Sequence, residues 1–115
     1  MKIRIADGTH AVTYQLDGSS TARSLYEQLP LSVEVGNYSS NEKVFTPTKE
    51  LDTSKVTNSS GSVGDMAYFS PWGNVALYFD HDAGPYQGLY AMGNVTSGQD
   101  QISQLSGTVT IEAQS

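Results

Sequence analysis

Aromatic side chains are the residues of this chain best suited to holding a ligand, and most of them fall between positions 45 and 90. Tyrosine and tryptophan combine a large apolar surface with a polar tip, which suits the lining of a binding cleft. The alternative is that these residues fill the interior of a strand-rich protein, and this is the better interpretation for Phe69 and Phe79. We predict a ligand-binding cleft formed by Phe45, Tyr68, Trp72, Tyr78 and Tyr90.

Trp72 differs from the other aromatic residues because it lies in a turn. The sequence Pro-Trp-Gly-Asn from Pro71 separates two apolar segments, and such a turn belongs at the rim of a domain. The indole of Trp72 therefore either packs beneath a loop or lines the mouth of a pocket, and the sequence leaves both interpretations open.

A second candidate for chemistry is the sequence Asp80-His81-Asp82, which directly follows an apolar segment. If a strand continues through it, the two carboxylates share one face and the imidazole lies on the other, so the three cannot bind one metal ion. A turn would change this arrangement, and the simpler interpretation is a strand end in solvent. We therefore predict no metal site. His10 stands alone beside a turn, where we expect a surface residue.

Residues for covalent catalysis are not evident. The chain contains no cysteine, which excludes disulfides, thiol nucleophiles and cysteine-bound metals. The Gly-x-Ser-x-Gly pattern of serine hydrolases is absent because Ser60 stands where its first glycine would be, and no glycine-rich phosphate loop occurs. We assign no catalytic residue and predict no cofactor.

Charge and hydropathy limit the classes of partner that the chain can bind and the cellular location we expect for it. Six basic residues against twelve acidic ones give a net charge of −6. The only arginines are Arg4 and Arg23 and the lysines are scattered, so nucleic acid and anionic membranes are poor partners. No apolar run is long enough for a membrane span. At the start of the chain apolar and polar residues alternate as in a strand, a pattern that does not resemble a signal peptide. We expect a cytoplasmic location, with a removed export leader as the alternative.

The length predicts a single domain over residues 1–115. Alternating residues at 3–5 and 12–16, separated by Asp7-Gly8, predict a β-hairpin. An apolar stripe at i, i+3, i+4 and i+7 from residue 22 to 29 predicts a short helix that Ser19 or Ser20 caps and Pro30 ends. A third strand is expected at 31–35.

Residues 36–64 are rich in Ser, Asn, Thr and Lys, and they are long for a connection without structure. We expect a short strand near 43–46. The rest is either a lid over the pocket, hinged at Gly36 and at Gly61 or Gly64, or a tolerated surface insertion.

The second half alternates between strands and turns. Strands are predicted at 66–69, 75–79, about 89–95 and 108–113, with one or two helical turns at 101–105. Roughly seven strands with two short helices in a chain of this length indicate a closed or nearly closed β-barrel.

This order of elements resembles small bacterial cyclophilin-like proteins. The resemblance covers nearly the whole chain, and its most specific part is the pair of segments Gly-Asp-Met-Ala-Tyr-Phe from Gly64 and Gly-Asn-Val-Ala-Leu-Tyr-Phe from Gly73. It implies a mostly β fold, a closed cyclophilin-like β-barrel of about eight strands with two short helices at its ends. Some members of that family are joined to flavodoxin-like domains.

The departures from true cyclophilins bear on function. Prolyl isomerases of this fold carry a Phe-His-Arg strand and a Phe-Met-x-Gln-Gly-Gly-Asp segment, and neither occurs here. Without a positioned cation, the isomerisation barrier of about 18–20 kcal/mol has no evident stabiliser. Our leading hypothesis is a non-enzymatic module that binds a small molecule or short peptide. The alternatives are a weak peptidyl-prolyl cis-trans isomerase and an interaction domain for a flavodoxin-like redox partner.

Overall fold

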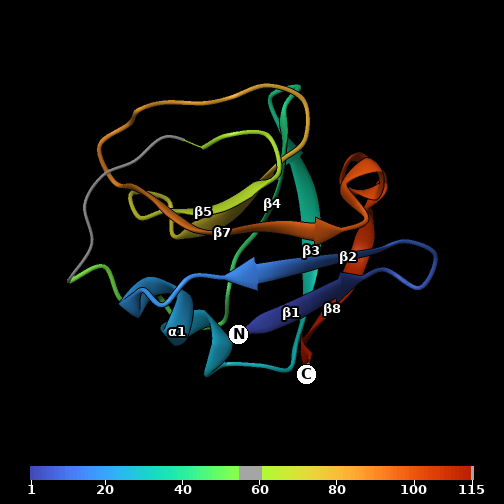
Figure 1. The fold of residues 1–115 in the computed structure, drawn as a ribbon, viewed down its shortest axis with the longest axis horizontal. Coiled ribbons are helices and arrows are strands. Elements are labelled where there is room, and N and C mark those ends of the chain that lie inside the picture. Colours follow the sequence, from blue (N-terminus) through green and yellow to red (C-terminus); the bar gives the residue numbers. More distant parts are fainter. Residues whose placement is uncertain (55–60, 115) are drawn as a thin grey trace.

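Antiparallel strands form a closed barrel in the computed structural model of the chain, which describes residues 1–54 and 61–114 (Figure 1). Around the barrel the order is β1-β2-β7-β5-β6-β4-β3-β8, and β8 pairs with β1 to close it. This confirms the predicted fold class. The strands are β1 (Lys2–Ala6), β2 (Ala11–Leu16), β3 (Leu31–Tyr38), β4 (Glu42–Phe45), β5 (Asp65–Phe69), β6 (Asn74–Tyr78), β7 (Leu89–Ser97) and β8 (Gly107–Gln114).

Alternate residues of the strands fill the barrel interior, as the two-residue period of a strand requires, and β7 interrupts this alternation where its pairing with β2 and β5 shifts register. Two helices close its ends: α1 (Ser20–Tyr26) contributes Leu25, and the 3-10 helix η1 (Gln99–Gln104) contributes Ile102. They lie at opposite ends of the barrel in Figure 1. The largest fully buried side chains of the interior are Tyr14, Ile3, Ile5, Leu25, Met66, Leu77, Met92, Ile102, Leu105, Ile111 and Val12.

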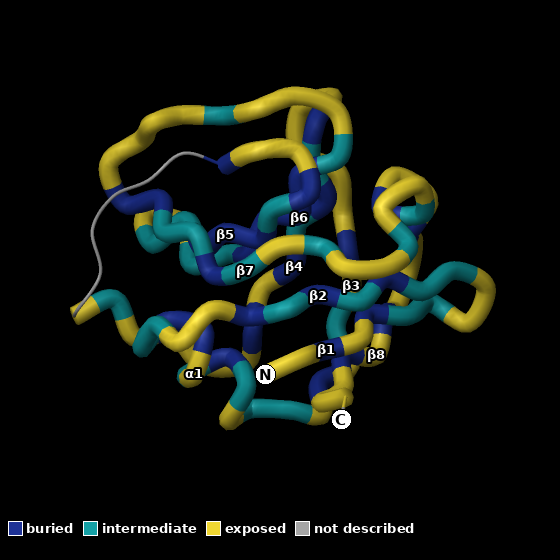
Figure 2. Tube along the Cα trace, viewed as in Figure 1, coloured by how far each residue is buried: buried dark blue, intermediate teal, exposed yellow. Residues whose placement is uncertain are grey.

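A second, smaller apolar cluster covers the outside of the barrel over β5 and β6. Its buried members are Ala67, Ala76, Tyr78 and Leu89. Neighbouring strand residues such as Leu77 belong to the interior cluster, so the two clusters occupy opposite faces of the same strands. The loop over residues 79–88 arches across the top of Figure 1 and is mostly exposed in Figure 2.

Helix α1 begins as predicted, because the Ser19 side chain accepts a hydrogen bond from the backbone N–H of Ala22 at 3.1 Å. It ends at Tyr26, earlier than the predicted 22–29. The N–H of Leu29 bonds the carbonyl of Tyr26, a tightened turn, and Pro30 disfavours helical backbone at the residue before it. None of the helices in the described part of the chain has the length and apolarity to cross a membrane.

The polar segment 36–64 contains the expected short strand, β4. Gly36 lies inside β3 and is therefore not a hinge. Lys49 is joined by two hydrogen bonds to Gln28, in the turn that follows α1, and the Thr21 hydroxyl of α1 donates to the carbonyl of Asp52 at 2.6 Å. The described residues 46–54 therefore pack at the α1 end of the barrel; the rest of the predicted lid, 55–60, lies outside the described residues.

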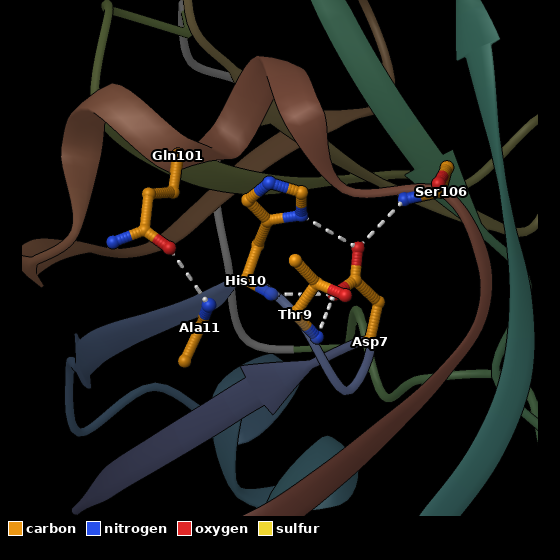
Figure 3. A network of polar contacts seen from close by, with 6 residues as sticks. All are labelled: Asp7, Thr9, His10, Ala11, Gln101 and Ser106. Atoms are coloured by element: carbon orange, nitrogen blue, oxygen red, sulfur yellow. Dashed lines mark hydrogen bonds and ion pairs between the residues drawn. The ribbon is translucent and has the colours of Figure 1, made fainter.

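A polar network joins the β1–β2 turn to the start of β8 (Figure 3). The Asp7 carboxylate accepts hydrogen bonds from the backbone N–H groups of His10 at 2.6 Å, Thr9 at 2.8 Å and Ser106 at 3.2 Å, and it lies 3.1 Å from Nδ1 of His10. These bonds, that of His10 foremost, hold the pKa of Asp7 well below its usual range. His10, predicted to be a surface residue, is thus half-buried and serves the fold.

Candidate functional site

A cavity of about 390 Å³ opens on the outside of the barrel, next to the second apolar cluster. Its volume lies within the range of small-molecule sites, roughly 300–1,000 Å³. Strands β3 to β6 and the loop 79–88 supply its walls. The lining residues are Tyr38, Ser39, Asn41, Glu42, Phe69, Trp72, Asn74, Tyr78, His81, Asp82, Ala83, Tyr86 and Leu89.

Strand register places the wall residues side by side. Glu42 of β4 pairs with Tyr38 of β3 on one side and with Tyr78 of β6 on the other. Phe69 of β5 pairs with Asn74 of β6. Side chains directly opposite each other on one face of antiparallel strands lie about 4.5–5.5 Å apart at Cβ, so these residues form one continuous outer surface.

Trp72 stands at the mouth of the cavity, in the turn between β5 and β6. The turn is closed by the N–H of Gly73, which donates to the carbonyl of Phe69 at 2.9 Å. The indole contacts Tyr38 edge to face, with centroids 5.0 Å apart, and Phe69 in the same way at 5.3 Å. Because 56% of Trp72 remains exposed, it lines the mouth and is not packed beneath a loop.

Tyr78 forms a buried wall of the cavity and is 2% exposed. Gly61 packs directly against its ring: a Cβ at position 61 would lie 2.2 Å from Cε2 of Tyr78. Two backbone hydrogen bonds of 2.8 Å join Gly61 to Ala83 and so fasten the loop 79–88 beside this ring. Burial first, and the charge of Glu42 second, raise the pKa of Tyr78, so its phenol stays neutral at physiological pH.

The charged groups of the cavity are acidic. Burial raises the pKa of Glu42. Asp82 enters from the loop and accepts a hydrogen bond from the N–H of Val63 at 2.9 Å. The loop is held partly by the buried Asn41, whose side-chain amide donates to the carbonyl of His81 at 3.2 Å. None of the described lining residues is lysine or arginine.

The five predicted cleft residues separate into three places. Trp72 and Tyr78 meet at the cavity. Phe45 and Tyr68 point into the barrel, each 2% exposed, and the Tyr68 hydroxyl accepts a hydrogen bond from the N–H of Leu51 at 3.4 Å. Tyr90 packs partly against the interior cluster and lines a separate depression beside Pro71.

Several lining residues were not predicted: Tyr38, Glu42, Phe69, Asp82 and Tyr86. Phe69 was assigned to the interior, but it lies on the outer face of β5 and is packed against the second cluster. For Tyr38 and Glu42 a signal was present, because a turn between them makes a hairpin in which they face each other. For Tyr86 and Asp82, which lie in the loop, no local pattern marks the position.

The Asp80-His81-Asp82 segment does not continue β6, which ends at Tyr78. The His81 ring lies 3.2 Å from Asp80 in an exposed pair, while Asp82 turns toward the cavity and Val63. Within residues 1–54 and 61–114, no three His, Asp or Glu side chains are grouped as a metal ion would require.

Fold and cavity together define a closed, eight-stranded antiparallel barrel of the cyclophilin type with a pocket on its outer face. Comparison with protein families places the chain more narrowly: the model of the Cyclophilin-like family matches residues 5–114, and the chain belongs to this family.

A solved structure with the same fold is the solution structure of a hypothetical protein from Archaeoglobus fulgidus. It superposes with a TM-score of 0.77 at 18% sequence identity, over 97% of this chain and 93% of that protein. Among curated proteins, none is similar enough in sequence to count as a relative.

Proposed function

We propose that the chain is a binding module that takes a small molecule or a short peptide into the outer-face cavity without catalysing a reaction. The observation that carries this proposal is the group of large aromatic residues left in water around a hollow: Trp72 is 56% exposed, Tyr86 55% and Tyr38 45%. Exposed aromatic surface gathered at a concave site is typical of recognition, since a ligand that covers it removes apolar area from water.

The walls of the cavity are held in place before any ligand arrives. The ring of Tyr78 is fixed by Gly61, and Trp72 is held by edge contacts with Tyr38 and Phe69. Such ring pairs contribute about 0.5–1.5 kcal/mol each beyond the area they bury. A pre-organised wall lowers the entropy lost on binding, which favours a binding role.

The lining also favours binding over prolyl isomerisation. An isomerase of this kind needs a positioned cation at the twisting amide. Arg4 lies in β1, and Arg23 lies beside a different depression at α1, so neither lines the described cavity. The charged carboxylates that do line it can only accept hydrogen bonds.

Trp72 offers a direct test because it is the only tryptophan of the chain. We expect its fluorescence to change and saturate as a ligand from a mixed set of aromatic fragments and X-Pro peptides is added. Tyr38→Ala should weaken the binding of that ligand about tenfold or more, as truncation of an aromatic anchor does. Tyr90→Ala, in the separate depression, should leave the affinity unchanged.

The same X-Pro peptides distinguish the alternatives. Exchange between cis and trans peptide, measured by NMR at catalytic protein concentration, should be no faster than without protein. Faster exchange would replace the binding proposal with an isomerase. If no fragment or peptide binds, the small-ligand proposal is contradicted, and the flavodoxin-like partner remains to be tested by co-purification.

A further inference from the structure

The cavity combines three features that constrain the chemistry of its ligand: ring walls at steep angles, a carboxylate between two tyrosines, and two carboxylates with no lysine or arginine among the described lining residues. The inference drawn from them rests on the proposed binding function and specifies the ligand class.

The ring walls form a partial aromatic cage. Trp72 meets Tyr38 at an interplanar angle of 72° and Phe69 at 83°, so three neighbouring rings face the cavity in different directions. The face of an aromatic ring carries negative charge density. Rings set at steep angles around one space are therefore suited to an organic cation, and tryptophan is the most effective of the aromatic residues in this role.

The carboxylate of Glu42 lies on the same surface. Its cross-strand neighbours are Tyr38 and Tyr78, so aromatic residues flank it on both sides. Residue 43, next in the strand, is a lysine, but Lys43 faces the opposite side, pairs with Leu77 of the interior and is 7% exposed. Among the described residues, no lysine or arginine forms an ion pair with Glu42.

This environment is unfavourable for the charge of Glu42 when the cavity holds no cation. Partial burial removes water from the carboxylate and raises its pKa, and the described lining residues include no lysine or arginine to compensate its charge. Asp82, from the loop 79–88, adds a second carboxylate to the lining. An anionic ligand would add to this charge, a neutral one would leave it uncompensated, and a cation would relieve it.

We propose that the cavity selects ligands that carry an alkylated ammonium group, which lies against the rings of Trp72 and Tyr38 while Glu42 compensates its charge. The group can belong to a free organic cation or to the modified side chain of a peptide, because both present the same chemistry to the cage.

Isothermal titration calorimetry with a matched pair of probes tests the proposal. Choline and 3,3-dimethylbutan-1-ol have the same shape and differ in the charge of one atom. We expect choline to bind about tenfold more tightly than the neutral alcohol, within the range of a partly desolvated cation–π contact. Glu42→Gln should remove most of this difference, and Trp72→Ala should weaken choline binding. The matched control Glu50→Gln removes the same charge at an exposed residue outside the cavity and should change neither value.

A second pair, N-acetyl-trimethyllysine amide and N-acetyl-norleucine amide, identifies the source of the ammonium group. Binding of the first without binding of choline assigns the group to a peptide side chain and supports the proposal. Equal binding of each charged probe and its neutral partner would overturn the ammonium assignment and leave the binding function intact. If neither charged probe binds while other fragments do, the ammonium assignment fails. If no fragment or peptide binds, the binding function itself fails.

Discussion

Substitution of Gly61 by alanine tests whether the buried wall of the cavity is as tightly fitted as its contacts imply. A methyl group there would lie 2.2 Å from Cε2 of Tyr78 and 2.7 Å from two further ring atoms. Ordinary carbon contacts are about 3.5–4.0 Å, so the ring or the Gly61–Ala83 bridge must move by more than about 1 Å. Overpacking of this kind costs about 1–3 kcal/mol, and a chain of this size should lose roughly 4–12 °C in Tm.

Thermal unfolding and ligand titration with Trp72 fluorescence measure the two consequences. Gly61→Ala should lower the Tm and weaken binding together, because Tyr78 serves both the second apolar cluster and the cavity. Gly36→Ala is the matched control: a Cβ at position 36 meets no heavy atom within 4 Å. The double variant Gly61→Ala with Tyr78→Leu should show coupling, since the smaller side chain relieves the clash. If Gly61→Ala has the same Tm and the same ligand affinity as Gly36→Ala, the tight fit between Gly61 and Tyr78 is refuted.

Three further predictions concern buried and titrating groups. The hydroxyl of Tyr14 is buried without a hydrogen-bond partner among the described residues, so Tyr14→Phe should leave stability unchanged or raise it by about 1 kcal/mol in urea unfolding; a loss of that size would reveal a partner. The pKa of Asp7 is lowered in the folded state, so its contribution to stability is present above the ordinary aspartate pKa of about 3.9 and is lost as the pH falls below it. Asp7→Ala should therefore lower the Tm at pH 7 and reduce the loss of Tm between neutral and acid pH. A plot of Tm against pH that runs parallel to that of the unsubstituted protein would contradict this. Because burial raises the pKa of Glu42, choline affinity should rise with pH through that pKa, and Glu42→Gln should abolish this pH dependence. The other titratable residues that line the cavity are Tyr38, Tyr78, His81, Asp82 and Tyr86. A pH dependence that survives the substitution would assign the titration to one of them.

The fold could be predicted from the sequence largely because its strands carry local signals. The hairpin of β1 and β2 has clear alternation on each side of Asp7-Gly8, and the strands at 66–69 and 75–79 are separated by an obvious turn. The helix was predicted too long, since the apolar stripe continues to Leu29 after the backbone has left the helix. Leu29 still packs against the core, so its place in the apolar stripe correctly indicates that it is partly buried, although its backbone is not helical.

The site was harder to predict because it depends on which face of each strand is outside. Tyr68 and Phe69 are both aromatic neighbours in a strand that is apolar on both faces, and the sequence does not reveal that Phe69 is the outward one. The grouping of Tyr38, Glu42 and Tyr78 depends on the barrel order β3-β4-β6, which joins segments far apart in the chain. Trp72 could be assigned to the rim because a turn between two strands lies at the edge of a sheet, whereas a residue within a strand can face either side of it.

Chemical-shift mapping on ¹⁵N-labelled protein is the most direct test of whether the outer-face cavity binds a ligand. The probes are the ammonium compounds and X-Pro peptides described above. We expect saturable shifts at the Trp72 indole N–H and at the backbone N–H groups of Tyr38, Glu42 and Tyr86, with Tyr90 unaffected. Shifts that gather around Tyr90 instead, or spectra that do not change with any probe, would contradict it.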